Sequence, residues 1–335
     1  MNSRNLLMKI NLNIRNRLKN YFYNLKYGAL TKLFIYNDKR EGEIFYHNYL
    51  FFKQKYLGQK DFLEEPGQLF LLPAWADYNK KIKKYFLNDF SMNFLSQPVI
   101  TETMFIKPKW QKRQLKYLET KYPTAELKKL LLEDKFGQPI ISSYRYRTSA
   151  NTIHHLNHLA LFADKTKGIL KNVKNVIEWG GGYGNMAKIF LRINSNVTYT
   201  IIDSPIFIFI QAIYLSSIFG REKINIITKS KQEIKNNLIN LIPLNPETIK
   251  NIDFGQPDIF ISTWALSESN EFSQNIIEQL NYFNSKHLLI AHQSTSPTMP
   301  FADNIINKIS KYEKLYHEKI PYIGGANIYL FAKKI

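Results

Sequence analysis

A glycine-rich turn between an apolar run and a helical pattern constrains the fold of this chain more than any other feature. The apolar run covers 174–178, the glycines cluster in 180–184, and the helical pattern follows over 185–193. Glycine lets a backbone bend sharply and approach a ligand without a side chain in the way. The helix start beyond it offers free N–H groups and a partial positive charge, which suit a carboxylate or a phosphate. A strand, turn and helix in this order predict a ligand site.

A second apolar run, 197–202, ends at Asp203, 23 residues after Gly180. A carboxylate at the end of the second strand can accept hydrogen bonds from both hydroxyls of a ribose, as it does in nucleoside-cofactor folds. The glycine turn and this aspartate together predict a cofactor that contains adenosine.

Two cofactors fit this pattern. The sequence at 182–187 matches G-x-G-x-x-A, the pattern of dinucleotide sites, but a glutamate beside the turn would repel a pyrophosphate. The same stretch also reads E-x-G-x-G-x-G, with Glu178, Gly180, Gly182 and Gly184 in the named positions. That pattern suits S-adenosylmethionine, because this molecule has no phosphate and carries an ammonium group that a carboxylate attracts. We therefore predict S-adenosylmethionine and keep NAD as the alternative.

The rest of the chain alternates strand and helix patterns. Helices are expected over 149–164, 205–218 and 271–284, strands over 224–228, 257–263 and 287–292, and a closing hairpin over 313–318 and 326–333. This alternation predicts an α/β fold, a doubly wound and mostly parallel Rossmann-like sheet with an antiparallel terminal hairpin. We assign residues 146–335 to this domain, and residues 1–145 to a mainly helical accessory region that helps to form the substrate pocket.

Three stretches resemble motifs of the bacterial sugar O-methyltransferases, which are class I S-adenosylmethionine-dependent enzymes associated with surface polysaccharides. The stretches are 176–186, 199–205 and 258–263 with Ser267-Glu268 after it, and the likeness covers roughly 145–335. Trp179 stands where relatives carry a small aliphatic residue, and no acidic residue follows the expected strand 224–228.

The resemblance implies methyl transfer to a sugar hydroxyl of a bacterial surface glycan or of its precursor. It implies S-adenosylmethionine as the cofactor. The residues expected to bind this cofactor are Glu178, Gly180, Gly181, Gly182, Asp203, Ser204 and Thr263.

A hydroxyl is a poor nucleophile at neutral pH, so a general base is expected beside the methyl group. Ligands of a doubly wound sheet bind outside the carboxyl ends of the strands. Glu268 follows the strand expected at 257–263, His292 ends the next strand, and His155 lies in the helix before the first strand. Each is a candidate base, and each also has a structural interpretation as a helix cap or a packed histidine.

Metal chemistry is not expected. His154 and His158 are spaced i, i+4 on one helix face, but no nearby carboxylate completes a site. The chain has no cysteine, which excludes disulfides, thiolate-bound metals and a thiol nucleophile. It therefore also excludes C5 methylation of pyrimidines, which needs that nucleophile.

The charge of +19 is concentrated in the first half, where 1–170 hold 29 of the 46 basic residues and 14 of the 27 acidic ones. This favours an anionic partner, although lysine is frequent in the whole chain. One alternative function is therefore methylation of RNA, at ribose or within rRNA. Another is a non-catalytic glycan-assembly factor with a degenerate cofactor fold.

A basic amphipathic helix is predicted over 7–26, and it would suit peripheral contact with an anionic inner membrane. No apolar run has the length of a bilayer span, and the N-terminus lacks the core of a signal peptide. We predict a cytoplasmic protein.

Overall fold

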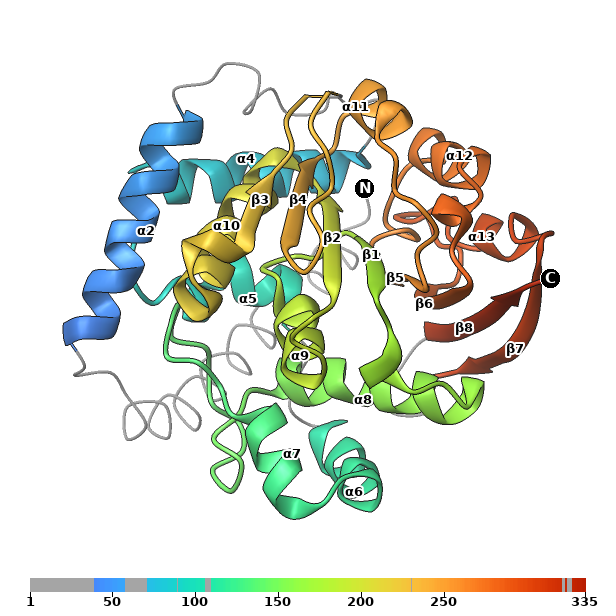
Figure 1. Cartoon of the computed structure of the whole chain (residues 1–335), viewed down its shortest axis with the longest axis horizontal. Helices are drawn as coiled ribbons and strands as arrows, with labels where there is room; N and C mark the ends of the chain where they lie inside the picture. Colours follow the sequence, from blue (N-terminus) through green and yellow to red (C-terminus); the bar gives the residue numbers. More distant parts are fainter. Residues whose placement is uncertain are drawn as a thin grey trace, which may run out of the picture.

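The computed structural model describes residues 39–57, 71–88, 90–105, 110–229, 231–320, 323 and 327–335. Within these ranges eight strands form one sheet in the order β3-β4-β2-β1-β5-β6-β8-β7 (Figure 1). The strands are β1 Asn175–Trp179, β2 Thr198–Asp203, β3 Ile224–Ile226, β4 Ile239–Pro243, β5 Ile259–Thr263, β6 His287–Gln293, β7 Tyr312–Lys319 and β8 Asn327–Lys334.

Helices precede the sheet and connect its strands. The first group is α2 Lys39–Leu57, α4 Pro73–Asn88, α5 Pro98–Met104, α6 Gln111–Lys121, α7 Thr124–Leu131 and α8 Ala150–Thr166. The connecting helices are α9 Asn185–Ile193, α10 Pro205–Phe219, α11 Pro246–Asn251, α12 Glu271–Gln279 and α13 Asn304–Asn307. None of the helices in the described ranges has the length and apolar character needed to cross a bilayer.

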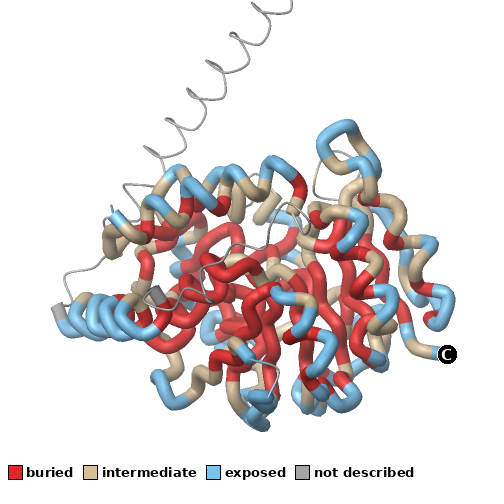
Figure 2. Tube along the Cα trace, turned by 90° about the horizontal axis from the view of Figure 1, so that it is seen from above, coloured by how far each residue is buried: buried red, intermediate tan, exposed pale blue. Residues whose placement is uncertain are grey.

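The sheet separates two hydrophobic cores. Alternate residues of a strand point to opposite faces, so Val176 and Ile201 face one core while Ile177 and Ile202 face the other. Helices α8, α9 and α10 cover the first face, with α2 and α4 packed outside α10, and α11, α12 and α13 cover the second. Figure 2 shows the resulting buried centre between exposed outer layers.

The pairing confirms the predicted fold class. Strands β3, β4, β2, β1, β5 and β6 run parallel to one another, whereas β8 pairs antiparallel with both β6 and β7. This is a doubly wound, Rossmann-like α/β sheet with an antiparallel terminal hairpin. The strand order reverses at β1, which has β2 on one side and β5 on the other.

The sequence pattern did not predict one strand of the sheet, β4. The stretch predicted at 224–228 forms only the short edge strand β3, and the strand beside β2 is β4, which no prediction covered. Its five residues read INLIP, too short and too mixed with asparagine and proline for a strand pattern. All five are nevertheless buried, because β4 has parallel neighbours on both sides.

Local signals fixed most helix boundaries. Ser149 caps α8, and its side chain accepts a hydrogen bond from the backbone N–H of Thr152. Pro123 separates α6 from α7, and the helix expected over 271–284 ends at Gln279. The predicted helix over 7–26 and residues 324–325, between the two strands of the expected hairpin, lie outside the described residues.

A buried ion pair joins the N-terminal helices to the sheet layer. The Lys188 side chain on α9 and the Glu133 side chain after α7 are both fully buried, with Nζ 2.6 Å from Oε2. Lys188 also donates to the hydroxyl of Tyr214, and Glu133 accepts from the hydroxyls of Ser149 and Thr152. Lys188 and its partners thereby fix the start of α8 beside the first turns of α9.

Candidate active site

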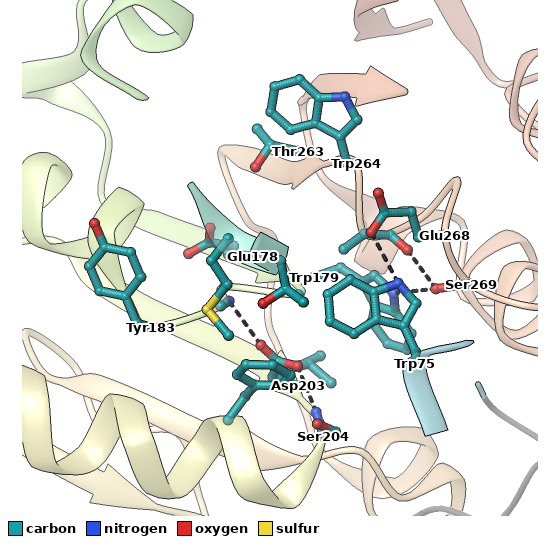
Figure 3. Close-up of a pocket in the computed structure, with 18 of the residues that line it drawn as sticks. Trp75, Glu178, Trp179, Tyr183, Asp203, Ser204, Thr263, Trp264, Glu268 and Ser269 are labelled. Carbon is teal, nitrogen blue, oxygen red and sulfur yellow. Dashed lines mark hydrogen bonds between the residues drawn. The ribbon is translucent and has the colours of Figure 1, made fainter. Parts of the chain in front are cut away.

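A cavity of about 350 Å³ lies outside the carboxyl ends of β1, β2 and β5, where the strand order reverses. This is the place where doubly wound sheets bind ligands. Its walls come from α4, α5 and α8, from the last residues of β1, β2, β5 and β6, from the glycine turn after β1, and from the segments that follow β2, β4 and β5. Figure 3 shows Glu178, Asp203 and Glu268 around this cavity.

Gly180 could not be replaced by any other residue without distortion. Its φ is 77°, in the region that L side chains rarely adopt, and a Cβ built on it would lie 2.1 Å from the Cβ of Ala265. The turn therefore packs directly against the segment after β5. Gly180, Gly181 and Gly182, all predicted to contact the cofactor, line the cavity. Gly184 is the N-cap of α9, with a φ of 93°.

Asp203 ends β2 and lines the cavity, as predicted from its position. Oδ2 accepts hydrogen bonds from the backbone N–H of Gly182 at 3.0 Å and from Nε2 of Gln211 at 2.9 Å. Oδ1 accepts from the N–H of Ser204 at 2.7 Å. Burial raises the pKa of Asp203 to about 7, although these donors favour the charged form. Ser204, also predicted, lines the cavity beside it.

Glu178 lies on β1, one residue before its end, and only 1% of its surface is exposed. The hydroxyl of Tyr199 donates to its Oε2 at 2.9 Å. Burial raises the pKa of Glu178 to about 8, and the nearby charge of Asp203 acts in the same direction. A cationic group placed in this cavity would reverse that effect and favour the carboxylate.

Glu268 follows β5 and lines the cavity, held from two sides. The indole Nε1 of Trp75 on α4 donates to Oε2 at 3.1 Å, and Nε2 of Gln293 at the end of β6 donates to Oε1 at 2.9 Å. Burial raises the pKa of Glu268 to about 7. A carboxyl group with a pKa near neutrality is suited to proton transfer at physiological pH.

Thr263, the last residue of β5, lines the cavity and is followed by a strained residue. Trp264 has a φ of 65°, which is rare for a bulky side chain and frequent at functional sites. Its indole Nε1 donates to Asn327 on β8 at 2.9 Å, and its ring stacks on His154 with centroids 5.2 Å apart.

The three helix histidines and His292 differ in where they lie. His155 and His154 line the cavity, whereas His158 does not. Burial, with the charge of Lys188, lowers the pKa of His155 to about 3, and its Nδ1 lies 3.0 Å from Nδ2 of Asn185. A histidine with so low a pKa is a weak proton acceptor.

His292 does not line the cavity. Its Nδ1 bonds to the carbonyl of Gln293 at 3.0 Å, and its ring stacks on that of His317. Alternate residues of β6 face opposite sides of the sheet, so His292 lies on the side opposite Leu289 and Ala291. Gln293, one residue further on, bonds to Glu268. In the described ranges, no group of three or more His, Asp or Glu side chains is arranged to hold a metal ion.

Several cavity residues were not found from the sequence. Trp75, Met104 and Phe105 come from the N-terminal region, where no motif pointed to them. Tyr183 lay inside the glycine motif, and its ring stacks on Phe105 at 5.4 Å between centroids. Gln211 interrupts the apolar first half of α10 and bonds to Asp203 from outside the cavity lining, a contact that depends on tertiary structure.

The ionisable groups that line the cavity differ in kind from those that dominate the chain. Its described lining includes three carboxyl groups and no lysine or arginine, although the net charge of the chain is +19. The aromatic side chains of Trp75, Phe105, Tyr183, Phe207 and Trp264 form much of the remaining wall.

The chain matches no family model and no curated protein. Among solved structures, it is similar to a mutant of MtNAS in complex with S-adenosylmethionine, at 12% identity and a TM-score of 0.40 over 86% of this chain and 97% of that one. Magnesium protoporphyrin IX methyltransferase (ChlM) from Synechocystis PCC 6803 with bound SAH is 12% identical, with a TM-score of 0.39 over 54% and 83%. The 16S rRNA methylase ArmA is 16% identical, with a TM-score of 0.32 over 69% and 100%. At these scores the similarity carries no functional argument, so we infer the function from the geometry of the cavity.

Proposed function

We propose that this protein is an S-adenosylmethionine-dependent O-methyltransferase that acts on a sugar hydroxyl of a bacterial surface glycan or of its precursor. The observation that carries the proposal is the lining of the cavity, which in the described part of the chain contains three carboxyl groups and no lysine or arginine side chain. The cavity lies where the strand order of the doubly wound sheet reverses. A bound cation favours the charged form of these carboxyl groups, which then attract a sulfonium and an ammonium group, whereas a pyrophosphate would oppose their ionisation, so S-adenosylmethionine fits the cavity better than NAD.

The sugar assignment comes from the motif resemblance at Glu178–Gly184, Asp203–Pro205 and Ser267-Glu268, and the aromatic wall supports it. Trp75 and Phe105 offer flat apolar faces, whereas an anionic acceptor would find no described lysine or arginine to bind it. The cavity therefore favours an acceptor whose methylated group is neutral and carries hydroxyls over an acceptor that is phosphorylated at that group.

We further propose that residues 1–145 are an accessory region that completes this pocket for the acceptor. Leu71, Trp75 and Asn79 line the cavity from within or just before α4, and Thr103, Met104 and Phe105 line it from α5 and its end. Closure by these side chains would exclude water, as methyl transfer requires.

Glu268 is the general base in this proposal. When bound, S-adenosylmethionine would supply a methyl group on a positively charged sulfur, and breaking the bond between them would leave that sulfur as a neutral thioether. Glu268 would take the proton of the acceptor hydroxyl as its oxygen bonds to the methyl carbon. Trp75 and Gln293 fix the carboxylate in one orientation. His155 is held by Asn185 and is weakly basic, and His292 lies outside the cavity, so neither is preferred.

Calorimetry with S-adenosylhomocysteine and, separately, with NADH tests the cofactor. We expect micromolar binding of the first and none of the second; the opposite result would reject the proposal. Mass spectrometry of glycans from strains with and without the gene then tests the acceptor, by the loss of one methyl group from a sugar.

The pH dependence of cofactor binding provides a further prediction. Free Glu178 has a pKa of about 8 and is mostly protonated at pH 7, whereas the ligand ammonium favours its charged form. Binding should therefore release a proton, and the affinity for S-adenosylhomocysteine should rise by up to about tenfold per pH unit between pH 6 and 8. Calorimetry in buffers of different ionisation enthalpy measures the released proton. Glu178→Gln should bind more weakly and with a shallower slope; an unchanged slope would contradict the assignment.

RNA methylation is the second candidate, favoured by the charge of +19. It predicts RNA binding that weakens steeply with salt. Absence of RNA binding at low salt would remove it. The cytoplasmic location and peripheral membrane contact predicted from the sequence remain proposals, because the helix expected over 7–26 lies outside the described residues.

A further inference from the structure

We propose that the outward face of α2 is the surface through which this protein contacts an anionic lipid membrane. The inference goes beyond the proposed function and does not depend on it, because lipid binding is measured without methyl transfer. It also differs from the contact predicted at 7–26, since it rests on described residues. We call this surface the α2 patch, and its members are Ile44, Tyr46, Leu50 and Phe51.

Helix α2 is apolar on two opposite sides. Its inner side packs on α10 and buries four aromatic side chains, Phe45, Tyr49, Phe52 and Tyr56. On its outer side, the four members of the α2 patch each keep more than a third of their surface exposed. Figure 1 shows α2 at the edge of the molecule, with α10 on its inner side.

The exposed apolar side chains are concentrated on this helix. Among the described residues, four of the ten exposed large hydrophobic side chains lie within 44–51. A surface helix normally places polar side chains opposite its apolar stripe, and a helix that is apolar all round is normally covered. Exposed apolar side chains gathered in one place mark an interaction surface.

Cations border the α2 patch at the C-terminal half of the helix. Nζ of Lys55 lies 5.5 Å from the centroid of the Phe51 ring, and Cζ of Arg221, which follows α10, lies 4.6 Å from the same centroid. These long side chains can lie along apolar surface while their charged ends reach lipid head groups. Leucine and aromatic side chains bordered by cations are typical of helices that bind the surface of anionic membranes.

Charge favours an anionic lipid surface over the other possible occupants. A second copy would bring the same cations against Lys55 and Arg221. Residues 1–38 of the chain contain seven Lys or Arg residues and one Asp, so they would be repelled as well. The acidic residues of α2, Glu41 and Glu43, lie at the other end of the helix, and Glu41 pairs with a lysine. A lipid surface that carries negative charge complements the cations instead.

Co-sedimentation of the full chain with lipid vesicles tests the inference. Vesicles of phosphatidylcholine alone are compared with vesicles of equal parts phosphatidylcholine and phosphatidylglycerol. We expect binding to the mixed vesicles at least about tenfold stronger than to the neutral ones, and weaker as salt is added. Failure of the wild-type chain to bind the mixed vesicles would overturn the inference.

Leu50→Asp tests the apolar part of the patch. The change removes an apolar contact with the lipid and adds a negative charge, so binding to the mixed vesicles should weaken at least about tenfold. Phe272→Asp is the matched control. Phe272 is 40% exposed, against 41% for Leu50, but it lies on α12, which covers the other face of the sheet. It should bind vesicles as the wild type does.

Lys55→Glu tests the cationic border and leaves the apolar side chains in place. It should weaken binding to the mixed vesicles about fivefold or more at low salt, and the difference should shrink at high salt. Lys250→Glu is its control, because Lys250 is exposed on α11, which also covers the other face. Unchanged vesicle binding by Leu50→Asp and Lys55→Glu would assign lipid contact to another part of the chain and overturn the inference. If Leu50→Asp does not fold, Lys55→Glu still decides.

Two further measurements detect the other occupants. Analytical ultracentrifugation should give the same size for the wild type and for Leu50→Asp. A wild-type dimer that dissociates in Leu50→Asp would show that a second copy covers the patch, against the inference. The melting temperature of Leu50→Asp should lie close to that of the wild type. A large fall with unchanged vesicle binding would show that the chain's own residues cover the patch, and this too would overturn the inference.

Discussion

Replacing Glu268 with glutamine is expected to slow methyl transfer by about 10²–10⁴-fold, the usual contribution of a general base. The glutamine keeps the size of the side chain but cannot accept the hydroxyl proton. Binding of S-adenosylhomocysteine should change little, because Glu268 is not among the residues proposed to hold the cofactor. The measurement is transfer of radiolabelled methyl from S-adenosylmethionine to glycan from a strain that lacks the gene.

The pH profile separates a base from a merely structural residue. With a pKa of about 7, Glu268 is protonated in acid, so the wild-type rate should rise as the pH increases and level off above about 7. In Glu268→Gln this rise should disappear. Glu271→Gln is the control, since Glu271 is exposed in the first turn of α12 and does not line the cavity. Retention of more than about a tenth of the rate by Glu268→Gln would reject its role as the base.

Replacing Lys188 with methionine is expected to lower the free energy of unfolding by about 3–5 kcal/mol. The change leaves the Glu133 carboxylate buried without its partner 2.6 Å away. It also removes the donor to Tyr214. Urea denaturation measures the effect, and the destabilisation should be smaller at low pH, where Glu133 becomes protonated.

Two further variants test that explanation. Adding Glu133→Gln to Lys188→Met should recover at least about 1 kcal/mol, because a neutral amide replaces the unpaired charge. Lys286→Met removes an ion pair of similar length, 2.8 Å, whose lysine side chain is 51% exposed, and should cost less than about 1 kcal/mol. A loss below about 1 kcal/mol for Lys188→Met would show that the buried pair is not essential to the fold.

The cofactor side of the cavity was the part most open to prediction from the sequence. The glycine turn and Asp203 belong to local strand–turn–helix units, so their spacing along the chain already placed them at the carboxyl ends of neighbouring strands. The same reasoning located Glu268, because it directly follows a strand that is buried and apolar. His292 was expected at the cavity, but alternate residues of a strand face opposite sides of the sheet. The next residue, Gln293, is the one that lines the cavity.

The sequence by itself determined the fold class and placed the glycine turn, Asp203 and Glu268 at the carboxyl ends of the strands, because these follow from short-range periodicity and turn chemistry. Only the tertiary structure decided what surrounds them. Trp75 reaches Glu268 across 193 positions of the chain, and Lys188 reaches Glu133 across 55. Contacts of this kind depend on how separate helices pack on one sheet, and side-chain packing over such separations leaves no periodic signal in the sequence.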